Sequence, residues 1–206
     1  MTSEEMELMN GAVERLQLKF EGLFNSETIE RCVEDSRQKL ASEATISMWL
    51  PVLIERLTND RLTGLARLES SAGARPGVLF LCDHNAGRSQ MAAGWMRHLA
   101  GDRVDVFSGG SSPSADSNRR VVETMAEVGI DISNEYPKPW TDEVMRGADV
   151  IVTMGCGEAC PILEGKRYVD WDIPSPRRLN PDELAEVRDD VRTRVEALMA
   201  TLGVLS

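Results

Sequence analysis

The chain has 206 residues, of which 42% are hydrophobic and 28% are charged. Both fractions are close to those of ordinary globular proteins, which excludes a disordered chain and a collagen-like fibre. The formal net charge of −11 has the wrong sign for a protein that mainly neutralises nucleic-acid phosphates or anionic lipids. We therefore expect no nucleic-acid partner and no membrane partner, and any bound anion must be held by a few local groups.

The compartment follows from the chain start and from the cysteine content. No apolar run approaches the ~18–20 residues of a membrane span, and residues 1–5 are acidic where a signal peptide is basic. These features predict a cytoplasmic protein. Four cysteines are too few for a disulfide scaffold, so they serve either packing or redox and nucleophilic chemistry.

Residues 1–72 carry the apolar periodicity of three amphipathic helices. Ser26 is the expected N-cap of the second helix, and Cys32 on that helix is most simply a packing residue. The pattern predicts a small three-helix bundle. So small a unit gains core by pairing with another copy, so we expect an oligomerisation or partner module and a homodimer. The three apolar stripes are Met6–Leu23, Ile29–Leu40 and Leu50–Leu65.

A small, polar, turn-rich stretch from Ser70 to Gly77 reads as a linker. In the second domain, residues 77–206, short apolar strands alternate with helical segments. This alternation predicts an α/β fold, a parallel sheet with helices on both faces. The last helix shows Asn180 as cap, Pro181 at its first position and Glu183 three residues after the cap. The other expected elements are strands at 78–81, 104–107 and 150–154 and helices at 89–99 and 118–128.

The first strand of this domain is followed by a C-x5-R-S sequence, from Cys82 to Ser89, and then by a helix. A strand end, a short loop and a helix N-terminus surround one point with backbone N–H groups and a positive helix dipole, which makes an anion site. The same field stabilises a thiolate, so Cys82 at the floor of the loop is the expected nucleophile. Arg88 supplies a fork for two oxyanion oxygens.

The remaining loop residues have supporting roles. Ser89 can donate its hydroxyl to the Cys82 sulfur, and Asn85 can hold the loop in a left-handed turn. Gly87 permits a close backbone approach. His84 could act as a base, although its side chain is expected to face solvent. The predicted anion-binding residues are Asp83, His84, Asn85, Ala86, Gly87, Arg88 and Ser89.

Cys156 and Cys160 follow the strand at 150–154, where a second active-site loop belongs, because the carboxyl ends of parallel strands meet at one edge. Two cysteines four residues apart can meet on one helical turn or across a short loop, and Gly155 would let the segment move. A zinc site would need a second half-site, which is missing because the other cysteines and histidines are scattered. Two inert packing cysteines are the remaining alternative.

Cys82–Ser89, the strand before it and the segment Val152–Pro161 resemble the arsenate reductases built on the low-molecular-weight protein tyrosine phosphatase fold. The resemblance spans about Gly77 to Leu202, and some members of that family are similar in carrying a helical N-terminal extension. It implies an oxyanion substrate, arsenate, and no bound cofactor or metal.

For members with three cysteines, the resemblance implies a relay. The Cys82 thiolate attacks arsenic, and Cys156 then attacks Cys82 and releases arsenite. Cys160 next attacks Cys156, which leaves a disulfide that a dithiol protein such as thioredoxin can reduce. Members that use a small thiol such as mycothiol need only the first cysteine, so the pair favours thioredoxin as the external reductant.

One departure from the family pattern concerns the general acid. The family carries an Asp-Pro whose aspartate protonates the leaving oxygen, and the matching position here holds Ser175. Asp172 is the nearby carboxylate that could enter the active site as the general acid. Alternatively, Asp172 is a solvent-exposed loop residue with no catalytic role.

Three rival functions follow from the same residues. A phosphatase would use the same loop, because phosphate and arsenate share charge and shape, but it does not need the two later cysteines. A mycothiol-coupled arsenate reductase is the second rival. The third is a non-catalytic regulator that captures arsenite through Cys82, Cys156 and Cys160.

Overall fold

In a computed structural model, which describes residues 3–41, 50–69, 75–156 and 160–204, the chain begins with three helices that share one apolar core. One predicted detail is wrong: the second helix is capped by Asn25, whose Oδ1 accepts from the Thr28 N–H at 2.9 Å, and Ser26 is already helical. Residues 70–74 of the expected linker lie outside the described ranges. The helices are α1 (Ser3–Lys19), α2 (Ser26–Ala41) and α3 (Leu50–Glu69).

A parallel four-stranded sheet in the order β2-β1-β3-β4 follows the helices and confirms the predicted fold class. At the carboxyl edge of the sheet, Cys82 is in register with Gly110 on one side and Met154 on the other. The loop after β1 therefore lies between the segments that follow β2 and β3. The strands are β1 (Gly77–Cys82), β2 (Asp105–Gly110), β3 (Val150–Met154) and β4 (Arg167–Asp170).

Both faces of the sheet are covered, because alternate side chains of β1 point in opposite directions. Val78 and Phe80 pack under α4 (Arg88–Ala100), α5 (Arg119–Ala126) and α7 (Pro181–Leu202). Leu79 and Leu81 pack under α6 (Asp142–Gly147). Within the described residues, short 3-10 turns occur at Gly101–Arg103 and Pro176–Arg178. The predicted capping box of α7 is present, with Asn180 and Glu183 each bonded to the other's backbone N–H.

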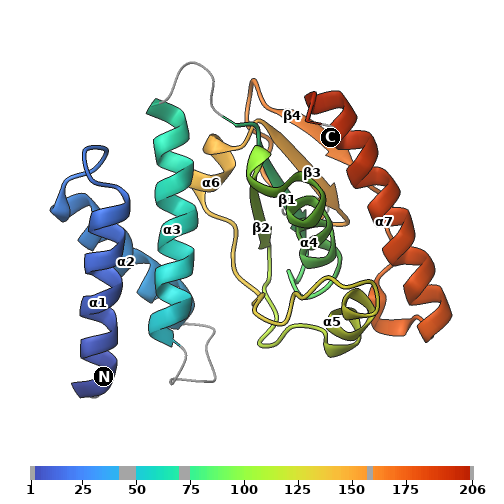
Figure 1. Cartoon of the computed structure of the whole chain (residues 1–206), viewed down its shortest axis with the longest axis horizontal. Coiled ribbons are helices and arrows are strands. Elements are labelled where there is room, and N and C mark those ends of the chain that lie inside the picture. Colours follow the sequence, from blue (N-terminus) through green and yellow to red (C-terminus); the bar gives the residue numbers. More distant parts are fainter. Residues whose placement is uncertain (1–2, 42–49, 70–74, 157–159, 205–206) are drawn as a thin grey trace.

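The three N-terminal helices stand beside the sheet, on the side of α6 and away from α7 (Figure 1). Two glycines allow α3 to touch α6: a Cβ on Gly64 would lie 2.5 Å from the Glu143 carbonyl oxygen, and one on Gly147 would lie 2.5 Å from the Gly64 oxygen. The buried Arg61 of α3 pairs with Glu143 at 2.6 Å. Arg67 of α3 pairs with Asp105 of β2 at 2.6 Å.

These contacts fix the bundle on the sheet. None of the described helices is long and apolar enough to cross a lipid bilayer.

Candidate active site

The loop between β1 and α4 begins at Cys82, the candidate nucleophile. Cys82 ends β1, has a free thiol and is only 2% exposed. Its Sγ lies 3.0 Å from the Oγ of Ser89, which stands in the first turn of α4. The sulfur is therefore held beside a hydroxyl group and near the N-terminal end of a 13-residue helix, where the helix dipole favours negative charge.

Asn85 is the internal brace of this loop. It is fully buried, and its φ of 46° makes it a left-handed residue, as predicted for this position. Its Nδ2 donates to Ser89 Oγ at 2.8 Å, and its Oδ1 accepts from the backbone N–H of Lys138 at 3.0 Å. Its own carbonyl accepts from Gln90 Nε2 at 2.6 Å. The Asn85 side chain thus links the Ser89 hydroxyl beside Cys82 to the backbone at Lys138.

The carbonyl groups of the loop are occupied by the segment that follows β2. Backbone N–H groups of that segment donate to the carbonyl oxygens of Asp83, His84 and Ala86 at 2.8–3.0 Å. Gly110 at the end of β2 allows this approach, because a Cβ there would lie 2.8 Å from the Asp83 oxygen. With these carbonyls engaged, the loop N–H groups are the polar backbone groups suited to an anion.

Arg88 is the first residue of α4, and its side chain is 13% exposed. Its Nη2 is 3.7 Å from Asp83 Oδ2, and its Nη1 donates to the Ile173 carbonyl at 3.4 Å. Gly155 has a φ of 73°, and a Cβ there would lie 2.6 Å from Arg88 Nη1. Gly155 is therefore needed for the backbone turn and for space beside the guanidinium.

A cavity of 280 Å³ opens above Cys82. Its floor comes from the predicted loop, and its walls come from residues 114–118, which no sequence motif marks, and from residues 175–177, which include Ser175. Arg177 Nη2 donates to Ser114 Oγ at 3.2 Å and joins those two walls. The lining residues are Cys82, His84, Ala86, Gly87, Arg88, Ser114, Asp116, Asn118, Ser175, Pro176 and Arg177.

The structure separates the two positions considered for the general acid. Ser175 lines the cavity, as its place in the family pattern implies. Asp172 is exposed and lies outside the lining, and its backbone carbonyl accepts from Arg194 at 3.4 Å. The carboxylate on the cavity wall is Asp116. A positional signal for it exists in the sequence, because residues 111–118 follow a strand that ends at the same sheet edge as Cys82.

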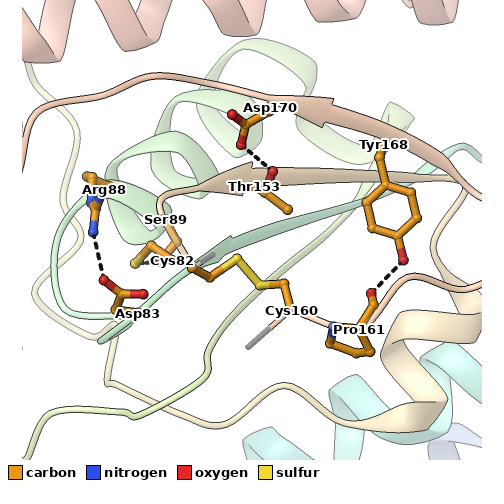
Figure 2. Close-up of a disulfide and its surroundings, with 10 residues drawn as sticks. Cys82, Asp83, Arg88, Ser89, Thr153, Cys160, Pro161, Tyr168 and Asp170 are labelled. Carbon is orange, nitrogen blue, oxygen red and sulfur yellow. Dashed lines mark hydrogen bonds and ion pairs between the residues drawn. A yellow bond between two sulfur atoms is a disulfide. The ribbon is translucent and has the colours of Figure 1, made fainter. Parts of the chain in front are cut away.

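Cys156 and Cys160 form a disulfide, with their Cα atoms 5.7 Å apart (Figure 2). Cys156 is two residues beyond Met154, which pairs with Cys82, so the disulfide lies next to the loop. Cys156 is 5% exposed, whereas Cys160 is only partly buried. Within the described ranges, no group of three or more His, Cys, Asp or Glu side chains is placed to hold a metal ion.

Residues 135–138, between α5 and α6, connect the N-terminal helices to the loop that follows Cys82. Tyr136 donates its hydroxyl to the Leu53 carbonyl of α3 at 3.1 Å, and burial raises its pKa well above 10, so the hydroxyl stays protonated. Burial raises the pKa of the adjacent Glu135, but the positive charges of Lys138 and Arg97 more than offset this, so the pKa is lowered overall. The ionised Glu135 accepts from Arg97 Nη1 at 2.9 Å, and the Lys138 N–H reaches Asn85.

A cysteine at the floor of a cavity, with an arginine at the start of the next helix, is the geometry found here, and a family model matches the same part of the chain. The model of the low molecular weight phosphotyrosine protein phosphatases matches residues 77–204. The chain belongs to this family. A second model, the N-terminal domain of protein-tyrosine-phosphatase-like proteins, matches residues 9–66.

Several proteins that resemble this chain are arsenate reductases. The structure of the thioredoxin-dependent arsenate reductase Cg_ArsC1' of Corynebacterium glutamicum is similar over 96% of this chain and 97% of that one, with a TM-score of 0.82 and 38% identity. Arsenate reductase 2 of Staphylococcus epidermidis is 36% identical over 124 residues, 58% of this chain and 93% of that protein. The putative arsenate reductase of Halobacterium salinarum is 32% identical over 121 residues, 56% of this chain and 85% of that protein. The first similarity extends over the N-terminal helices as well as the sheet.

Proposed function

We propose that this protein reduces arsenate to arsenite through Cys82, Cys156 and Cys160, and that thioredoxin regenerates it. The observation that carries the proposal is the Cys156–Cys160 disulfide beside a free Cys82 at the floor of the cavity. This is the pairing that the three-cysteine relay leaves at its end. The similarity to a thioredoxin-dependent arsenate reductase over nearly the whole chain supports the same assignment.

In the first step, the loop N–H groups of residues 83–89 and the Arg88 guanidinium bind the arsenate oxygens. The Cys82 thiolate forms a bond to arsenic, and one arsenate oxygen leaves as water after taking up protons. We assign the proton donor to Asp116 rather than Asp172, because Asp116 lines the cavity and Asp172 does not. Ser175 cannot supply a proton as a carboxylic acid does.

In the second step, the Cys156 thiolate attacks Cys82 Sγ. The sulfur–arsenic bond breaks, its electron pair stays on arsenic, and arsenite leaves. Cys160 then attacks Cys156 Sγ, which frees Cys82 as a thiolate and leaves the Cys156–Cys160 disulfide. Two electrons have passed from two thiols to arsenic.

In the last step, a dithiol protein reduces this disulfide. Its thiolate attacks Cys160, the less buried of the two cysteine residues, and Cys156 leaves as a thiolate. The second thiol of the reductant then attacks the mixed disulfide and releases Cys160. Thioredoxin is the proposed reductant, and mycothiol is the alternative that the test must address.

The test is arsenate-dependent NADPH oxidation in the presence of thioredoxin and thioredoxin reductase. Wild type should turn over, and Cys82→Ser, Cys156→Ser and Cys160→Ser should not. Cys32→Ser is the matched control, because Cys32 is buried in the bundle core, and it should keep wild-type activity. Full activity of Cys160→Ser would overturn the relay, and turnover only with mycothiol would overturn the thioredoxin assignment.

A phosphatase is the second candidate, because the family and the cavity suit phosphate as well as arsenate. A phosphatase needs Cys82 and Arg88 but not the cysteine pair. Hydrolysis of a phosphoester by a protein that is inactive with arsenate and every reductant would favour this candidate. Tight binding of arsenite without turnover would instead indicate a regulator.

We further propose that residues 1–72 form an oligomerisation module separate from the catalytic unit 77–206, and that the protein is a homodimer. Support comes from the small size of the bundle and from Leu18 of α1, which is 75% exposed. Sedimentation equilibrium tests this, with twice the chain mass expected. A monomer at micromolar concentration would contradict it.

A further inference from the structure

The segment after Cys160 presents one apolar side chain outward. Ile162 is 86% exposed, the highest value among the large hydrophobic residues that the structure describes as exposed. It lies two residues from a redox-active sulfur, within a chain length of about 7 Å. Leu163, the next residue, packs against the core of the sheet instead. Ile162 therefore contributes little to the folded chain.

Tyr168 fixes this outward position. Its hydroxyl donates to the Pro161 carbonyl at 2.9 Å (Figure 2). The same hydroxyl accepts from the Leu163 N–H at 2.9 Å. The two backbone groups that flank Ile162 are thus both hydrogen-bonded to the hydroxyl of Tyr168, a residue of β4. Because both are turned toward Tyr168, the Ile162 side chain is directed to solvent from a restrained turn. A restrained apolar residue loses little conformational entropy when a partner covers it.

We propose that Ile162 is the apolar docking contact for the dithiol protein that reduces the Cys156–Cys160 disulfide. This rests on the proposed function. Thiol–disulfide exchange requires the reductant's sulfur to approach Cys160 Sγ to bonding distance. A protein that brings its own sulfur there must cover the residues around Cys160, and Ile162 is the exposed apolar one. A small thiol makes no such contact.

The test compares Ile162→Ser with wild type in two reductant assays at saturating arsenate. With thioredoxin as the varied substrate, kcat/KM should fall about tenfold, the usual scale for losing one central apolar anchor. With dithiothreitol in place of thioredoxin, kcat/KM should stay at the wild-type value. Leu68→Ser is the matched control, since Leu68 is 51% exposed on α3, and it should behave as wild type with both reductants.

Two further readouts separate docking from a structural effect. The arsenite released in a single turnover of pre-reduced Ile162→Ser should equal that of wild type, because the relay does not involve this side chain. Ile162→Val, which keeps an apolar branched side chain, should retain most of the activity with thioredoxin.

The outcomes are distinct. Equal kcat/KM for thioredoxin in Ile162→Ser and wild type would overturn this inference and leave the proposed function standing. An equal loss with dithiothreitol would also overturn it, because Ile162 would then act on the chain itself. A wild-type protein that turns over with dithiothreitol but not with thioredoxin would overturn the proposed reductant, and the docking inference with it.

Discussion

Replacing Asn85 tests whether the nucleophile loop is braced as described. Asn85→Ala removes the hydrogen bonds to Ser89 Oγ and from the Lys138 N–H, each worth about 1 kcal/mol. It also places a Cβ-bearing residue with no local side-chain hydrogen bond at a φ of 46°, which costs about 1 kcal/mol more. The expected loss is about 3 kcal/mol in the free energy of unfolding.

Asn85→Gly separates the two contributions. Glycine loses the same hydrogen bonds but tolerates the left-handed backbone, so it should be about 1 kcal/mol more stable than the alanine variant. Both variants should reduce kcat/KM for arsenate strongly, because Ser89 and the loop N–H groups lose their support.

The assay is equilibrium denaturation of the reduced proteins in urea, with the unfolding free energies compared at a common slope. A loss below about 1 kcal/mol in Asn85→Ala would refute the buried network as an energetic unit. A glycine variant no more stable than the alanine variant would refute the left-handed assignment.

Three other perturbations test separate parts of the structure. Gly64→Ala should destabilise the protein by about 2 kcal/mol in urea denaturation, because its Cβ would lie 2.5 Å from a backbone carbonyl oxygen. Gly11→Ala in α1 is the control and should be neutral or stabilising. Equal effects of the two substitutions would contradict the close contact between α3 and α6. Burial raises the pKa of Cys32 to about 11, so iodoacetamide at about pH 8 should leave this thiol unmodified in the native protein. Peptide mass spectrometry should show that the thiol is labelled after denaturation. Rapid labelling of the native protein would refute the buried bundle core. Asp116→Asn should lower kcat with arsenate by about tenfold or more, while Asp172→Asn should not; the reverse order would return the acid role to Asp172.

Local signals in the sequence were sufficient for the strand, loop and helix around Cys82. Each of these elements is defined by residues adjacent in the chain: an apolar run, an Asn at a left-handed position and an arginine that opens a helix. The capping box of α7 was predictable for the same reason. Ser26 was a wrong choice of cap because Asn25, one residue earlier, offers the same kind of oxygen acceptor.

Other features depend on contacts between distant segments. The six-residue helix α6 and the four-residue edge strand β4 are too short for a periodic pattern. The cavity walls at Asp116 and Arg177 meet only after the chain has folded. Similarly, Gly155 suggests mobility when read alone, and its role beside Arg88 is visible only in three dimensions.

The most direct test of the relay is a single turnover of Cys160→Ser, pre-reduced, freed of reductant and mixed with excess arsenate. We expect one arsenite per chain and a disulfide between Cys82 and Cys156, identified by mass spectrometry of the linked peptides. Cys156→Ser under the same conditions should release no arsenite. Arsenite release from Cys156→Ser, or a Cys160→Ser protein that forms no Cys82–Cys156 disulfide, would contradict the three-cysteine relay.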